Sequence, residues 1–466
     1  MKYNLLFTII FASALMSEPS TYINSDVHFY DIHHLSDFSI INIPFRILTI
    51  NLDHQNGDFA FNSTMAMEYR PRKDNSYFIK GNQQEFFWDL REMYLSWFTS
   101  FGEIKVGKQI HSWSSVDDNS PIDNINAYDY YYIFNLGTDR KLGSLGLTLD
   151  YYFNNSKLGM YYSPLHHTNR LPINDPDFPI QLPVTPRANQ IISPKRADEY
   201  GFTLQQKMNL ADLSLTYFSG YDRLFSLSGS NVFTNQFQTV SVLDTVYSFR
   251  KTSMIGAGIV IPTDWFVLRA EFAQFETRDV LDSNDIRRAH PEFPNIYTDI
   301  IFSHAFKTKA KYYQAILQLE TELPGNIEFV GQYIQYDTLS FYSKNLPDVD
   351  LPLLEASFDP YSVFYPGMGT PLTILAKDAL LMIFSKSFFN EQLLIETLIL
   401  SDQSTEKEQK GTGKLVELKG TYDMTSSLKL ISAITYITGN SQLGNEYMFN
   451  KLENFSHLRF EIKYFF

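Results

Sequence analysis

Apolar and polar residues alternate one by one along most of this chain. In HLRFEIKYFF, residues 457–466, one parity is shared by Leu458, Phe460, Ile462, Tyr464 and Phe466, and the other by Arg459, Glu461 and Lys463. The same alternation occurs in SLGLTLDYYF at 144–153. Successive side chains of a strand point to opposite faces, so each of these segments predicts a β-strand with one apolar and one polar face.

Roughly 17 or 18 such segments, each about 8 to 14 residues long, follow one another, and this length suits tilted strands that cross a membrane. The sequence therefore predicts an all-β protein, a transmembrane antiparallel up-and-down β-barrel of about 18 strands, with 16 as the alternative. The count depends on Tyr22–His33, which is either the first strand or a leader on the periplasmic side.

The connections between these segments fall into two classes. Short turns at 209–210, 262–264 and 324–326 alternate with long polar loops. The long loops lie at about 111–143, 164–197, 222–246, 278–308 and 338–377. Short turns at one end and long loops at the other are typical of outer-membrane barrels, whereas a soluble β-sandwich has no reason to sort its loops in this way.

Composition agrees with a membrane barrel. Aromatic residues make up 16% of the chain, with 39 Phe and 30 Tyr, and strand-end Tyr and Phe would form the aromatic girdles at the membrane interfaces. The formal net charge of −14 argues against nucleic acid as a partner, because binding to phosphates needs a basic face. Cysteine is absent, which excludes disulfides, thiolate metal sites and a lipoprotein anchor.

The first residues resemble an export signal. Met1 and Lys2 are followed by an apolar run and then by small residues, so residues 1–17 are predicted to be a signal peptide and residues 18–466 the barrel. No stretch approaches the ~20 apolar residues that a transmembrane helix needs, so we expect any membrane span to be β. We expect the protein in the outer membrane of a Gram-negative-type bacterium, with a secreted or periplasmic soluble β-protein as the alternative.

Many ionisable residues lie on the polar face of the predicted strands, and this favours a water-filled interior. In a dry core each charge without a partner would cost several kcal/mol, whereas in a water-filled lumen it costs little. These residues are Arg46, Glu68, Arg70, Glu199, Lys207, Arg269, Glu271, Glu320, Glu322, Glu417, Lys419, Lys429, Arg459, Glu461 and Lys463.

The most distinctive stretch is VGKQIHSWSSVDDNSPIDNINAYD, residues 106–129. It resembles outer-membrane porin-like families, including the alginate-export type, in which such a strand runs into an acidic, Asn-containing loop. The matching positions are Gly107, Gln109, Trp113, Asp117, Asp123, Asn126 and Asp129. Ser114 and Ala127 depart from the pattern, where Gly and Pro are usual. The resemblance implies a monomeric or weakly oligomeric barrel whose loop after this strand folds inward and narrows the lumen.

The candidate constriction combines that loop with nearby charges. Its residues are Lys105, Gln109, Asp117, Asp118, Asp123, Asp129, Arg140, Arg269 and Glu271. The acids could orient polar solutes, or they could cap turns and face external solvent. Arg269 and Glu271 share a face, where an ion pair and simple solvation are both open. A calcium site is a further alternative, although the spacing does not match an EF-hand.

No other chemistry is predicted. His166 and His167 are adjacent and have no partner at ligand spacing, so we expect a surface pair, with no metal and no cofactor. An outer-membrane hydrolase would need a Ser–His pair, and no Gly-x-Ser-x-Gly elbow is present, so no enzyme is expected.

The predicted function is passive or facilitated diffusion of small polar solutes. The alternatives are a channel dedicated to an oligosaccharide or an organic acid, and a structural or adhesin barrel plugged by its own loops. The expected partners are the lipid bilayer, the solutes and the barrel-insertion machinery, with the choice between monomer and trimer open. The C-terminal residues resemble the assembly signal read by that machinery, namely Phe460, Ile462, Tyr464 and Phe466.

Overall fold

The computed structural model describes most of the chain from Pro19 to Phe466. The residues outside the description are 1–18, 71–85, 135–137, 174, 176, 179–185, 235–240, 291–292, 294, 297–298, 345–359, 407–408, 411 and 445–446. The predicted export signal at 1–17 therefore lies outside the described residues. Within the described part of the chain, no helix is both long enough and apolar enough to cross a membrane.

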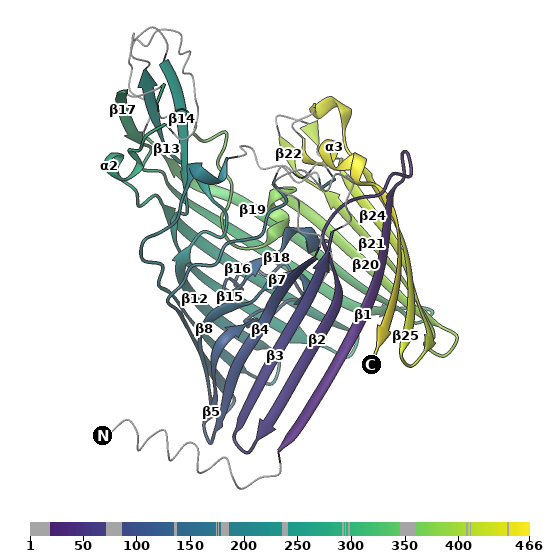
Figure 1. The fold of residues 1–466 in the computed structure, drawn as a ribbon. Coiled ribbons are helices and arrows are strands. Elements are labelled where there is room, and N and C mark those ends of the chain that lie inside the picture. Colours follow the sequence, from purple (N-terminus) through teal and green to yellow (C-terminus); the bar gives the residue numbers. More distant parts are fainter. Residues whose placement is uncertain are drawn as a thin grey trace.

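An 18-stranded antiparallel sheet closes on itself to form the barrel (Figure 1). The strands are β1 Ser20–His34, β2 Phe45–Asn56, β3 Phe59–Tyr69, β4 Phe86–Thr99, β5 Gly102–Gln109, β8 Ser144–Phe153, β9 Ser156–Ser163, β11 Glu199–Lys207, β12 Asp212–Tyr221, β15 Lys251–Pro262, β16 Phe266–Arg278, β18 Lys309–Leu323, β19 Ile327–Tyr342, β20 Asp378–Phe388, β21 Leu393–Asp402, β24 Lys414–Thr425, β25 Leu428–Thr438 and β26 His457–Phe465. The ring closes where β1 pairs with β26, with Asp26 opposite Phe465 and His34 opposite His457. The predicted fold is confirmed, and the segment at 22–33 is the first strand.

Short turns and long connections lie at opposite ends of the barrel. β4 and β5 are joined through Ser100 and Phe101, and β24 and β25 through Ser426 and Ser427. The long connections gather at the other end, where Figure 1 shows additional strands and helices rising above the ring. In barrels of this kind the short turns face the periplasm and the long loops face the exterior, and the two ends are named accordingly below.

β26 shows how the two faces differ. Phe460, Ile462 and Tyr464 are 48%, 46% and 49% exposed on the outer face, whereas Arg459 and Glu461 are each 8% exposed on the inner face. Closure pairs the backbone groups of every strand in the ring, as hydrocarbon requires, and leaves the apolar parity facing lipid.

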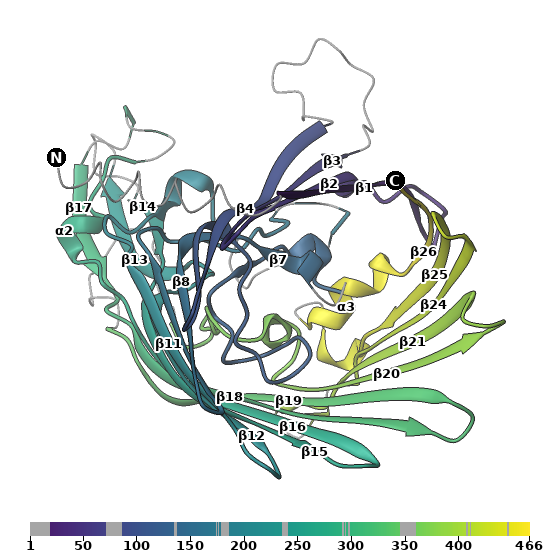
Figure 2. The same cartoon turned by 90° about the horizontal axis from the view of Figure 1, so that it is seen from below.

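Part of the barrel interior is a dry apolar core. Leu381, Leu400 and Leu415 point inward near the extracellular ends of their strands and pack in one cluster with Leu372 and Phe449. Phe449 belongs to the short helix α3, Met448–Leu452, which lies at the extracellular end (Figure 1) and within the outline of the ring in the view along the barrel (Figure 2). The expectation of a water-lined interior is therefore wrong for the extracellular half, because chain from the long connections fills it.

The remaining elements belong to those connections. β10 Ile191–Ile192, β14 Ser241–Ser248, β13 Ser226–Thr234 and β17 Asp299–Ala305 form a four-stranded sheet outside the barrel, next to α2 Ser283–Ile286 (Figure 1). Two-stranded ladders join β6 Ala127–Tyr128 to β7 Lys141–Leu142 and β22 Thr405–Glu406 to β23 Gln409–Lys410. Short 3-10 turns, η1 to η6, lie at Tyr130–Tyr132, Thr138–Arg140, Ala188–Gln190, Pro371–Ile374, Ser441–Leu443 and Glu453–Phe455.

Candidate functional site

The connection between β5 and β8, residues 110–143, enters the barrel and is called the inward loop below. Figure 2 shows its ladder strand β7 within the ring. Asp118 and Asn119 adopt φ values of 58° and 54°, a left-handed conformation that Asp and Asn tolerate better than most residues. These two residues turn the loop back towards the strand from which it came.

Glu271 on β16 anchors the inward loop to the wall. One of its carboxylate oxygens accepts hydrogen bonds from the backbone N–H groups of Ser115 and Val116, and the other accepts from the Ser120 hydroxyl. Glu271 is only 3% exposed. Arg269 does not pair with Glu271. It pairs with Glu320 and donates a hydrogen bond to the Ser115 carbonyl at 3.2 Å.

Asp117 lies against two glutamines of the wall. Its backbone N–H donates to Gln318 Oε1 at 3.0 Å, and its carboxylate accepts from Gln318 Nε2 at 2.8 Å. Gln332 Nε2 donates to the Asp117 carbonyl at 2.5 Å. Asp117 remains exposed, whereas Asp118 is half-buried and Asp123 and Asp129 are buried.

Asp118 and Asp123 are paired within the loop itself. Asp118 lies 3.2 Å from the Arg140 guanidinium, and Asp123 lies 2.6 Å from Lys141 Nζ. Burial alone would lower the pKa of Lys141, but the Asp123 carboxylate outweighs it and holds the pKa of this amine above its usual range. Lys141 was absent from the predicted residues, and the pair holds the two arms of the loop together.

Asp129 is fully buried at the far end of the loop. Arg46 Nη2 lies 3.5 Å from its carboxylate and Arg170 Nη1 lies 3.2 Å from it. Arg170 also reaches Glu68 at 2.8 Å. This cluster joins β2 and β3 to two long connections. Asp129 also caps η1 by accepting from the Tyr131 N–H at 3.2 Å, but it is buried and does not face open solvent.

Lys105 and Gln109 lie on β5, below the loop. Lys105 Nζ lies 3.4 Å from Glu103, and both side chains remain partly exposed to the interior. Gln109 is 1% exposed and donates to the Gly146 carbonyl at 3.2 Å while it accepts from Thr148 at 3.0 Å. The nine predicted residues therefore form several separate sets of contacts along the loop rather than one ring of charge.

A second inserted segment was missed from the sequence. Gln314 on β18 donates to the Met368 carbonyl at 2.9 Å and accepts from the Thr370 N–H at 2.8 Å. Gly369 N–H donates to Asn124 of the inward loop at 2.9 Å, and Gly369 has a φ of 95°. The stretch PGMGTP carried the signal, because glycine permits this backbone and a close approach to Gln314.

His166 and His167 are not a surface pair, so that expectation is wrong. His166 Nδ1 lies 2.9 Å from Glu199, and His167 Nε2 accepts from the Leu145 N–H at 3.0 Å. Burial and the Arg223 cation lower the pKa of His167 to about 4. Across the described residues no three His, Cys, Asp or Glu side chains gather as a metal-binding group.

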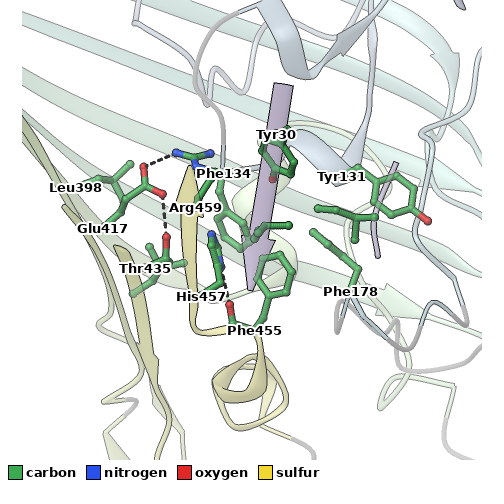
Figure 3. A pocket seen from close by; sticks show the side chains of 13 residues that line it. Tyr30, Tyr131, Phe134, Phe178, Leu398, Glu417, Thr435, Phe455, His457 and Arg459 are labelled. Carbon is green, nitrogen blue, oxygen red and sulfur yellow. Dashed lines mark hydrogen bonds and ion pairs between the residues drawn. The ribbon is translucent and has the colours of Figure 1, made fainter. Parts of the chain in front are cut away.

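A small cavity lies between the wall and the inserted segments (Figure 3). Tyr30 lines it from the wall, and Phe134, Phe178 and Phe455 line it from the connections. Its volume is about 30 Å³, which suits about one water molecule and not a solute. The polar groups at its edge already bond to one another: Glu417 lies 3.3 Å from Arg459 and accepts from Thr435 at 2.9 Å.

A larger cavity lies at the periplasmic end, beside β1 to β5. Its volume is about 300 Å³, the lower end of the range for small-molecule sites. Tyr22, Asp53, Asn62, Tyr94 and Glu103 are among the residues that line it. This cavity is therefore polar and acidic, and it is large enough for a small solute.

No family model matches the sequence, and no curated protein matches it. Solved structures do resemble the fold. OccAB4 of Acinetobacter baumannii is 12% identical, with 97% of this chain and 99% of that chain covered at a TM-score of 0.50. OccK8 (OprE) of Pseudomonas aeruginosa is 9% identical, with 96% and 98% covered at 0.49, and OmpF of Salmonella typhi in complex with daunomycin is 12% identical, with 96% and 97% covered at 0.40. The closed ring and its lipid-compatible outer face make this chain a multi-pass β-barrel of a Gram-negative-type outer membrane.

Proposed function

We propose that the protein is a channel for passive or facilitated diffusion of small polar solutes, narrowed by the inward loop. The observation that carries the proposal is the attachment of this loop to the wall through Glu271, Gln318 and Gln332. Below the loop, the polar cavity at the periplasmic end offers solutes a wet surface. The resemblance to the alginate-export type belongs to the same proposal, because it implies an inward loop at this position.

The charges along this path favour cations or neutral sugars. Asp53 and Glu103 line the larger cavity, and Asp117 is an exposed acid of the inward loop. A channel dedicated to an oligosaccharide or an organic acid is the alternative within the same class. In that case a single solute would block the current at low concentration, and other solutes of equal size would not.

Conductance in planar bilayers tests the channel directly. The purified, folded full chain is expected to give sustained ohmic currents. Asp117→Asn is expected to reduce cation selectivity, because this carboxylate is exposed beside the path. Asp118→Asn is the matched control, since Asp118 is paired with Arg140 at 3.2 Å and partly shielded. A folded barrel that stays silent at all voltages would contradict the proposal.

A plugged structural barrel is the second candidate, and one observation favours it. The extracellular half contains an apolar core in which Leu381, Leu400 and Leu415 of the wall pack with Leu372 and Phe449 of the inserted segments. A permanently plugged barrel would conduct only after these segments are removed. Conductance by the intact chain, compared with a variant that lacks residues 447–456, which contain α3 and η6, separates the two candidates.

The C-terminal strand is proposed to carry the assembly signal. Phe460, Ile462 and Tyr464 face outward, and Phe466 is 64% exposed. Side chains in this position would be accessible to the barrel-insertion machinery before β26 pairs with β1.

A further inference from the structure

One row of side chains on the outer face stands out by its charge. Through the register of five adjacent strands, Tyr221 lies opposite Lys251, Lys251 opposite Arg278, Arg278 opposite Lys309, and Lys309 opposite Tyr342. We call these five residues the basic row. Their sequence neighbours Thr252, Thr277 and Ala310 are 1%, 1% and 2% exposed and point inward, so Lys251, Arg278 and Lys309 face outward, and Tyr342 is 56% exposed.

The basic row lies at the extracellular ends of β12, β15, β16, β18 and β19, directly above a lipid-facing apolar surface. Ile255, Phe272 and Leu317 occupy the same parity further along these strands and are 67%, 47% and 49% exposed. The apolar surface would contact acyl chains, which places the basic row at the level of lipid headgroups. Tyrosines at both ends of the row suit the same interface.

The positive charge of the basic row is not neutralised by the protein. Within the described part of the chain, neither Arg278 nor Lys309 forms an ion pair or a side-chain hydrogen bond, and both are exposed. Lys251 donates only to the backbone carbonyl of Asp198 at 3.3 Å and lies 4.6 Å from the centre of the Tyr221 ring. Side chains directly opposite one another in a sheet are ~5 Å apart, and like charges at that separation destabilise the sheet.

Acidic groups near the row do not remove its charge. Glu276 lies one step below the row and is already paired with Lys311 at 3.2 Å. Asp337 lies a further step below, opposite Tyr313. In a chain with a net charge of −14, three adjacent cations without a paired acid run against the overall composition. An external anion would relieve their repulsion.

The periplasmic ends of the same strands show a different chemistry. Trp265 and Phe266 are 84% and 39% exposed there, and Thr321 lies opposite Phe266. This rim carries exposed aromatic side chains and no row of cations. The basic row is therefore specific to the extracellular end and is not a general feature of both rims.

We propose that the basic row binds the phosphorylated headgroup of an outer-leaflet lipid. The Arg278 guanidinium can hold a phosphate through two parallel hydrogen bonds, and Lys251 and Lys309 flank it as point charges. The hydroxyls of Tyr221 and Tyr342 can hydrogen-bond the rest of the headgroup. The acyl chains lie on Phe272 and Leu317, so the site recognises an amphiphile and not a free anion.

Native mass spectrometry of the detergent-purified full chain tests the site, with lipid A as the probe and its dephosphorylated form as the comparison. A basic residue near an anionic membrane surface contributes ~1 kcal/mol, or roughly fivefold in affinity. The triple variant Lys251→Gln, Arg278→Gln, Lys309→Gln is therefore expected to bind lipid A on the order of 100-fold more weakly than the unmodified chain. The dephosphorylated lipid is expected to bind both proteins equally weakly.

The matched control changes the same net charge inside the barrel. Lys419, Lys429 and Lys463 face the lumen and pair with Glu396, Asp423 and Asp26. Their triple replacement by Gln is expected to leave lipid A binding within about twofold of the original. Equal binding by the outer-face triple variant, equal weakening by the lumenal variant, or displacement of lipid A by millimolar inorganic phosphate would each overturn the proposal.

Discussion

Glu271 and Glu320 project into the same barrel from neighbouring strands, yet they differ in their exposure to solvent. Glu271 is 3% exposed and holds backbone N–H groups of the inward loop, whereas the Glu320 side chain is 23% exposed and pairs with Arg269. Glu320 lies nearer the periplasmic turn at 324–326. Two carboxylates of one inner face therefore serve different purposes, and the difference is set by whether chain from a long connection covers them.

The same contrast divides the whole interior. Towards the extracellular end, inserted segments bring their own apolar side chains and paired charges, so the wall behaves like the core of a soluble protein. Towards the periplasmic end, ion pairs such as Lys429 with Asp423 stay exposed to water. A charged side chain that points inward from the barrel wall can consequently have either of two roles. It anchors chain where the lumen is filled, and it meets solute where the lumen is open.

The largest expected effect comes from removing the Glu271 side chain, which anchors the inward loop to the wall. Glu271→Ala removes an acceptor that the N–H groups of Ser115 and Val116 share, and a buried polar group that loses its partner costs ~1–3 kcal/mol. We expect the barrel to lose about 4 kcal/mol of unfolding free energy, and the single-channel conductance to rise as the loop detaches. Urea denaturation and bilayer recordings measure the two effects.

Glu320, which lies in the water-exposed half of the barrel, provides the control for Glu271. Glu320→Ala truncates the same side chain four residues nearer the short turns, and a solvent-exposed ion pair contributes ~0–1 kcal/mol. We expect less than about 1 kcal/mol of destabilisation there. Equal losses at both positions would show that the distinction between dry and wet halves is false.

The second inserted segment gives the next largest effect. A methyl group on Gly369 would meet Gln314 Oε1 at 1.8 Å, and its φ of 95° already disfavours any other residue. We expect Gly369→Ala to cost about 3 kcal/mol, through backbone strain together with displacement of the segment from the wall. Gly444 has a φ of 72° but nothing within 4 Å of the added methyl, so Gly444→Ala should show the backbone cost alone. Thermal unfolding of both variants tests whether contact with the wall matters.

The sequence predicted the strands of the barrel wall far better than the contacts of the segments that enter the barrel. Alternation in segments such as 457–466 depends only on neighbouring residues, so strand count and lipid face could be derived from it. The partners of Asp129 could not, because Arg46 and Arg170 are distant in sequence and only the closed barrel brings them together. Parity places Glu271 and Glu320 on one face and carries no information about which of them an inserted loop will cover.

A smaller effect is expected from acidification at the rim of the dry half. The pKa of His167 is about 4 because burial and the Arg223 cation both oppose its charged form, whereas an unfolded histidine titrates near ~6.5. The stabilisation that this neutral ring provides is therefore complete above pH ~6.5 and is lost as the pH falls towards 4. Protonation also removes the acceptor for the Leu145 N–H.

His167→Gln separates this group from the other titrating residues nearby. Glutamine can still accept the Leu145 hydrogen bond but does not titrate in this range. We expect the variant to lose less stability than the unmodified chain between pH 6.5 and 4, when denaturation midpoints are compared across that interval. Identical pH profiles would mean that other groups at this rim, such as His166 and Glu199, dominate the acid response.

The smallest effect on stability is expected where the interior is wet. Lys429 lies 3.2 Å from Asp423, but the two side chains are 37% and 39% exposed, so the pair is worth ~0.5 kcal/mol or less. Lys429→Gln should leave the denaturation midpoint almost unchanged while it shifts the reversal potential towards cations. The shift should vanish in 1 M salt, where the screening length is ~3 Å.

Lys141→Gln is the counterpart in the dry half of the barrel, because it leaves the buried Asp123 without the cation that lies 2.6 Å away. This variant should lower stability by ~3 kcal/mol at any salt concentration. If salt suppressed both effects alike, Lys141 would be in contact with bulk water, and the inward loop would not seal the extracellular half of the barrel.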